Sequence, residues 1–210
     1  MALDLEEQEQ VASLKAWWHD HGNLVLSLIT AVAVGAAGWQ GWNWYQRTQI
    51  AEANSLYEQL AKGTQSGDAK AVRDAAGALA ENYSRTLYAS LAALVSARFH
   101  YDRKDVKSAK AALQWVIDRS PFDDLRDIAR LRIAALLLDE KAYDEALKVL
   151  EAKHGDAFVA QFAATKGDVL AAKAQTAEAK AAYRLALEKA DKSSESFRAG
   201  VQLRLDALGG

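Results

Sequence analysis

The sequence predicts an all-α protein in which an N-terminal transmembrane helix precedes a solenoid of helical hairpins. Three observations support this fold class. The 210 residues include a single proline and many alanines, respectively the strongest breaker and the strongest former of helices. Residues 22–46 carry no charged side chain. Beyond them, small residues recur at intervals of 37 and 33 positions.

Composition and charge exclude several classes of function. The formal net charge is −2, and residues 1–46 hold five acids and one base. Nucleic-acid-binding domains usually carry clustered basic residues, so nucleic acid is not an expected partner. The chain has no cysteine, which excludes disulfides and thiolate metal sites.

Residues 1–21 are predicted to form an amphipathic N-terminal arm. Val11, Leu14 and Trp18 fall at helical spacing, with acidic residues between the apolar ones. We therefore expect a short helix that lies along a membrane surface. Its acidic character distinguishes it from the basic helices that bind anionic lipids.

Residues 22–46 are predicted to cross a membrane as one helix. A hydrocarbon core about 30 Å thick needs about 20 residues of helix, and residues 24–45 are enough to cross it. Tryptophan and tyrosine, which prefer the headgroup level, close the run. The residues that mark the span are Leu24, Gly35, Gly38, Trp39, Trp42 and Tyr45.

Two other interpretations of this run are a buried core helix and a cleaved signal peptide. A core helix rarely stays uncharged over seven turns, and a signal peptide begins with a short basic region, whereas this one begins with a long acidic one. The bases near the run are nearly balanced, with Lys15 on one side and Arg47 and Lys62 on the other. Basic residues alone therefore do not fix the orientation.

Residues 47–85 are predicted to form a first helical hairpin. Its helices cover residues 50–62 and about 69–81, and a turn cluster at 63–68 containing two glycines separates them. Residues 82–84 end the second helix. A long helix is expected next, from about residue 86 to residue 101.

Residues 86–210 are predicted to contain three repeats of a helix pair and a capping helix. When three alanines of this region are aligned, each is followed by a larger residue four positions later. Each is also preceded by a small residue twelve positions earlier. The aligned small residues, expected where paired helices cross closely, are Ala97, Ala109, Ala134, Ala146, Gly167 and Ala179. The intervals are close to the 34-residue period of the tetratricopeptide repeat. Pro121 also lies where that repeat has its proline. The expected repeats are 86–122, 123–156 and 157–190, with a capping helix at 193–208.

A stacked array of this kind has a concave face formed by the first helix of each pair. Such a face suits an extended peptide or an amphipathic helix. The residues expected on it are Leu94, Arg98 and Tyr101 from the first repeat and Leu131, Ala135 and Leu138 from the second. The alternative for each leucine is an ordinary core position.

No pattern in the sequence predicts catalysis, a metal site or a cofactor. The chain contains no His-Glu-x-x-His, no Gly-x-Ser-x-Gly and no phosphate-binding Gly-Lys-Ser/Thr segment. We therefore expect a protein that acts by binding other molecules and not an enzyme.

The whole chain resembles the YfgM-like ancillary subunits of the SecYEG translocon, and the first sixty residues carry the strongest likeness. The matching segments are Glu9-Gln10-Val11, Leu14-Lys15-x-Trp17-Trp18, His21-Gly22, Gly38-Trp39-x-x-Trp42 and Ala53-x-x-x-Tyr57. The N-terminal arm departs from the family in having few bases.

This resemblance implies a single-pass protein of the bacterial inner membrane with a cytoplasmic N-terminus and a periplasmic repeat domain. The implied partners are the lipid bilayer, SecYEG, a membrane-anchored periplasmic chaperone of the PpiD type and unfolded secretory polypeptides. The implied function is to help transfer those polypeptides to periplasmic chaperones. Two alternatives are a scaffold for another envelope assembly and a regulator that binds a cytoplasmic signalling protein through the N-terminal arm.

Overall fold

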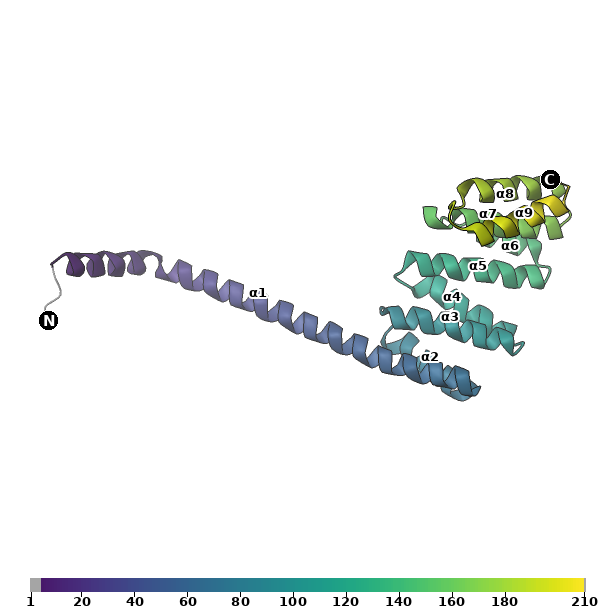
Figure 1. Ribbon diagram of the computed structural model, residues 1–210. Helices are drawn as coiled ribbons and strands as arrows, with labels where there is room; N and C mark the ends of the chain where they lie inside the picture. The colour runs from purple at the N-terminus through teal and green to yellow at the C-terminus, as the bar shows by residue number, and fades with distance from the viewer. Residues whose placement is uncertain (1–4, 210) are drawn as a thin grey trace. The chain divides into compact units, whose positions relative to one another are not determined.

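The computed structural model describes residues 5–209, and their regular structure is helical throughout (Figure 1). The chain divides after Gln49 into two compact units, residues 1–49 and 50–210. The elements in chain order are α1 (Leu5–Ser66), α2 (Ala69–Asn82), α3 (Leu87–Asp102), α4 (Val106–Arg119), α5 (Asp123–Asp139), α6 (Tyr143–Leu150), the 3₁₀ turn η1 (Asp156–Phe158), α7 (Val159–Ala172), α8 (Thr176–Lys189) and α9 (Glu195–Ala207).

Helix α1 joins three segments that the sequence treats separately: the arm, the span and the first helix of the hairpin. The only proline lies far away at position 121, so nothing in α1 removes a backbone donor, and its glycines are tolerated. Residues 1–4 of the predicted arm lie outside the described residues. Among the residues that the structure does describe, α1 is the one helix long and apolar enough to cross a membrane.

The side chains of the candidate span point away from any protein interior. Leu24 is 68% exposed and Trp39 is 70% exposed, and Trp42 and Tyr45 are exposed as well. A Cβ added at Gly35 or Gly38 would meet nothing within 4 Å. Exposed apolar side chains along several turns disfavour the buried-core interpretation and suit a helix solvated by lipid.

The three predicted repeats share one turn geometry. Lys104, Lys141 and Ala174 each adopt a positive φ, between 62° and 65°, just after the first helix of their pair. The next residue donates its N–H to a carbonyl five residues back: Asp105 to His100, Ala142 to Leu137 and Gln175 to Leu170, each at 2.8–2.9 Å. This is the Schellman arrangement, which satisfies the last carbonyls of a helix. Its recurrence at the intervals seen in the sequence shows that the pairs α3–α4, α5–α6 and α7–α8 are structural repeats.

The pairs stack in chain order (Figure 1), with contacts within each pair and between successive pairs. The structure places all six of the predicted packing residues in the interior: Ala97, Ala109, Ala134, Ala146, Gly167 and Ala179. The larger residues that follow the second-helix alanines are buried too, namely Leu113, Leu150 and Tyr183. Each pair thus contributes one continuous layer of the core.

The first hairpin has its own cluster of buried side chains, formed by Ala53 and Leu60 of α1 with Val72 and Leu79 of α2 and part of α3. Asp68 begins α2 by accepting hydrogen bonds from the N–H groups of Lys70 and Ala71. An N-cap of this kind typically stabilises a helix by about 1 kcal/mol.

The C-terminal end is closed by a polar contact between α7, α8 and α9. Asp168 accepts the Tyr183 hydroxyl at 2.8 Å and two hydrogen bonds from Arg204 at 2.8 and 2.7 Å. Burial and the hydrogen bond to Asp168 raise the pKa of Tyr183, so the phenol stays a neutral donor. Helix α9 therefore covers the last repeat by apolar packing and by this charge-assisted contact.

We expect Gly167→Ala to destabilise the repeat unit by about 1–3 kcal/mol, the usual cost of overpacking. The new Cβ would lie 2.5 Å from the Tyr183 ring, which is 2% exposed and held by Asp168. Gly77→Ala is the matched control, since nothing lies within 4 Å of that Cβ in mid-α2, and it should stabilise by about 1 kcal/mol. Urea unfolding of the full chain in detergent measures both. Equal midpoints for Gly167→Ala and the unaltered protein would contradict this packing.

Candidate interaction groove

Two parallel stripes of side chains, one on α3 and one on α5, face a common groove. The stripe on α3 runs through Leu91, Leu94, Val95 and Arg98, and that on α5 runs through Leu125, Ile128, Arg132 and Ala135. Positions three and four apart lie on one face of a helix, so each stripe follows from helical periodicity alone. Direct contacts between α3 and α5 keep the two stripes side by side.

The groove consists of two adjoining hollows with different chemistry. The first is largely apolar and is lined by Leu91, Leu94, Val95, Leu125 and Ile128. The second has an aliphatic floor that includes Leu113 and Leu136, with Tyr101 and Asp139 at its side. Arg98 and Arg132 line both hollows and so mark the junction between them.

The two junction arginines have different partners. The Arg98 Nε lies 2.9 Å from a carboxylate oxygen of Asp102, one turn later on α3. Arg132 donates to the main-chain carbonyl of Leu94 at 3.2 Å, and the ion pairs found among the described residues do not include it. Burial and the neighbouring Arg98 lower the pKa of Arg132. Its guanidinium is thus a cation with a hydrogen bond but no counter-charge.

The other polar groups of the groove are already engaged. Asp139 accepts the Tyr101 hydroxyl at 2.9 Å, and this hydrogen bond raises the pKa of Tyr101. Arg103 stacks over the Phe99 ring, 3.7 Å from its centroid, and donates to the carbonyl of Gly67. Arg132 differs from them in that its one hydrogen bond, to the Leu94 carbonyl, leaves its other N–H donors free to bind a partner.

The structure places four of the six predicted groove residues on its lining, namely Leu94, Arg98, Tyr101 and Ala135, although Leu94 is also a buried member of the core. Leu131 and Leu138 instead pack against the core cluster of the first two repeats. Sequence reasoning missed Ile128 and Arg132. It chose Leu131 and Leu138, each one residue and about 100° of helix before a lining residue, Arg132 and Asp139. The spacing of residues 125, 128, 132, 135 and 139 contains the signal that identifies the observed face.

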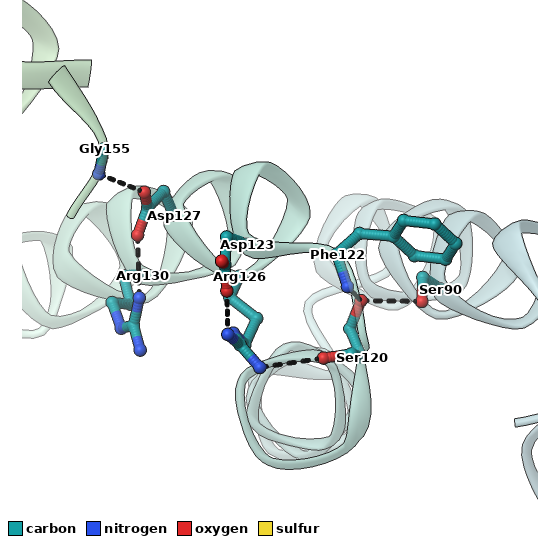
Figure 2. A network of polar contacts seen from close by, with 8 residues as sticks. All are labelled: Ser90, Ser120, Phe122, Asp123, Arg126, Asp127, Arg130 and Gly155. Carbon is teal, nitrogen blue, oxygen red and sulfur yellow. Dashed lines mark hydrogen bonds and ion pairs between the residues drawn. The ribbon is translucent and has the colours of Figure 1, made fainter. Parts of the chain in front are cut away.

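A network of polar contacts fixes the start of α5 and hence the position of its stripe (Figure 2). The Ser120 hydroxyl oxygen accepts from the Ser90 hydroxyl at 2.9 Å and from the Phe122 N–H at 3.2 Å. Arg126 donates to the Ser120 carbonyl at 3.1 Å and pairs with Asp123. Both serines are buried, so these bonds connect α3 to the turn before α5 without access to water.

Asp127 anchors the other side of α5. It is 2% exposed, and its two carboxylate oxygens accept from Arg130 at 2.7 Å and from the N–H of Gly155 at 2.9 Å (Figure 2). The second bond ties α5 to the segment that leads into η1 and α7. A buried carboxylate is stable only when it is paired and hydrogen-bonded in this way.

Within the described part of the chain, no group of three or more His, Asp or Glu side chains is placed to hold a metal ion. The groove combines apolar surface, two arginines and one tyrosine, and these are groups that bind peptides by burial and by charge-assisted hydrogen bonds.

Comparison with known proteins agrees with this architecture over nearly the whole length. A family profile described as a tetratricopeptide repeat-like domain matches residues 15–210. The chain is 30% identical to the ancillary SecYEG translocon subunit of Haemophilus influenzae over 87% of this chain and 89% of the relative. Proteins with the same name from Neisseria gonorrhoeae and Escherichia coli are 29% and 27% identical, over 99% and 87% of this chain and 100% and 88% of theirs. No solved structure matches at a significant level.

We expect Asp127→Ala to destabilise the repeat unit by about 2 kcal/mol, because it removes the acceptor of the Gly155 N–H and the counter-charge of the mostly buried Arg130. Asp124→Ala is the matched control. It removes an exposed acid from the first turn of α5, three residues before Asp127, and should cost less than about 1 kcal/mol. Chemical denaturation in detergent checks both, and equal losses would show that Asp127 is not an anchor.

Proposed function

We propose that this chain, which belongs to the family of ancillary SecYEG translocon subunits with a tetratricopeptide repeat-like domain, holds a polypeptide-binding groove at the SecYEG translocon. The observation that carries the proposal is the groove along α3 and α5, present in a chain whose α1 is suited to crossing a membrane. The proteins to which the chain is similar are named as subunits of that translocon, which supplies the partner.

A membrane tether explains how a modest binding site becomes effective. Confinement near a partner turns a later encounter into an effectively intramolecular one, and effective concentrations in the millimolar range are typical of short connections. A groove held at the exit of a translocon would therefore meet each emerging chain before that chain could diffuse away. Weak and reversible binding is an advantage there, since the polypeptide must be released again.

We further propose where the protein lies, how it is oriented in the membrane and what happens to the polypeptide that it binds. The N-terminal arm is cytoplasmic, residues 22–46 cross the inner membrane, and residues 47–210 lie in the periplasm. The repeat domain receives unfolded secretory polypeptides and helps to pass them to periplasmic chaperones, with a membrane-anchored chaperone of the PpiD type as a direct partner. The role that we propose is one of binding.

Protease accessibility tests the orientation. When protease is added to intact spheroplasts, we expect loss of an epitope placed after Leu208 and survival of one placed before Leu5. Lysis of the spheroplasts should remove both epitopes, which shows that the protease reaches them. Survival of the C-terminal epitope in intact spheroplasts would place the repeat domain in the cytoplasm and contradict the proposal.

Site-specific photocrosslinking in intact membranes tests the role of the groove. A photoreactive residue at Ala135, exposed on the groove lining, should crosslink to secretory polypeptides during export. The same residue at Ala181, exposed on α8, is the matched control and should yield far less. We also expect crosslinks to SecYEG from positions in the span. Crosslinks to other envelope proteins alone, or changes in signalling but not secretion on deletion of residues 1–20, would favour a scaffold or a regulator instead.

A further inference from the structure

Each of the two helices that form the groove carries a junction arginine seven residues after a leucine of the groove lining. Arg98 follows Leu91 by seven residues on α3, and Arg132 follows Leu125 by seven residues on α5. Seven residues of helix span about 10 Å. On each helix an apolar level, marked by the leucine, and a cationic level, marked by the arginine, therefore lie about 10 Å apart.

The apolar level has room for a partner side chain. Leu91, Leu125 and Ile128 are only partly buried, and Leu87, one turn before Leu91 on the same face, is 47% exposed. These side chains line a hollow instead of filling it. A large apolar residue that enters this hollow would shield their exposed surface, at about 25 cal/mol for each Å² removed from water.

The cationic level lacks one counter-charge. Arg98 already has Asp102, and Asp139 already accepts the Tyr101 hydroxyl. Arg132, facing the same groove, is ion-paired with no carboxylate among the described residues and has Arg98 as a like-charged neighbour. A carboxylate brought in by a partner would relieve this repulsion and accept charge-assisted hydrogen bonds.

We propose that the groove recognises polypeptide segments in which an Asp or Glu side chain follows or precedes a large apolar residue by about three positions, with the carboxylate on Arg132 and the apolar residue between Leu91 and Leu125. An extended chain advances about 3.3 Å per residue, so three residues cover the 10 Å between the two levels. This inference rests on the proposed function, because it names the chemistry of the polypeptides that the groove would receive.

Short peptides with blocked ends test the proposal on the full chain in lipid nanodiscs, with empty nanodiscs as the blank. Each fluorescent probe carries a phenylalanine and, three positions away in either order, Asp or Asn. Fluorescence anisotropy should show the Asp peptide binding about fivefold more tightly than the Asn peptide, the effect of one partly exposed ion pair. The preference should shrink as ionic strength rises, because salt screens exposed charges. Equal binding of both peptides to the unaltered protein would overturn the proposal.

Substitutions locate the effect at one residue. Arg132→Gln should abolish the preference for Asp over Asn, and Arg132→Glu should reverse it in favour of a Lys peptide. Arg184→Gln makes the same charge change on the exposed surface of α8 and should leave the preference intact. Circular dichroism melts confirm that each variant is folded. A preference that persists in folded Arg132→Gln would exclude Arg132 as the recognition group.

Three further outcomes test the inference, and the last two separate it from the proposed function. An Asn peptide that binds as tightly as the Asp peptide once its C-terminal carboxylate is left free would show recognition of chain ends, which overturns the proposal for internal acidic residues. If no probe discriminates but groove crosslinks to exported chains remain, the carboxylate rule fails and the translocon role stands. If the probes discriminate but those crosslinks are absent, the recognition chemistry stands and the assigned role fails.

Discussion

Close approach of paired helices at small residues is the constraint on which the structure of residues 50–210 depends. Ala97, Ala134 and Gly167 lie at equivalent points on the first helix of each pair, and all three are buried. Gly167 shows how closely the helices approach, since one added methyl group would meet the Tyr183 ring. This spacing brings α3, α5 and α7 side by side on one face. The groove is therefore a consequence of how the core is packed.

The features that were predictable from the sequence are those with a period. The bounds of α2, α3 and α9 lie within two residues of expectation, because a turn cluster or a capping residue ends each segment. The intervals of 37 and 33 residues identified the repeats, and the same intervals recur in the Schellman turns. These turns use Lys104, Lys141 and Ala174 where glycine is the usual residue. The residue types at these three positions therefore did not predict a left-handed backbone conformation.

The features that were not predictable depend on which way a helix faces. On α5 the sequence analysis expected Leu131 on the groove, but the structure places Arg132 there. The two neighbouring positions are hard to tell apart in the sequence, because both lie near the edge of an apolar face. Asp127 is an ordinary acid in the sequence, and only the chain segment brought back at Gly155 explains its burial. Such contacts join residues 28 positions apart. Local pattern carries no information about them.

The groove differs from the C-terminal end of the array in how its charges are paired. Asp168 in the last repeat receives both Tyr183 and Arg204, so the end that α9 covers is fully paired. Arg132 in the middle of the array has only a main-chain carbonyl and stands beside a second arginine. An acid at position 135, three residues later on the same stripe, would stabilise Arg132 through helix spacing, but alanine occupies it. Arg132 therefore combines a position on an apolar groove with the lack of an ion-pair partner among the described residues, a combination that suits a binding surface.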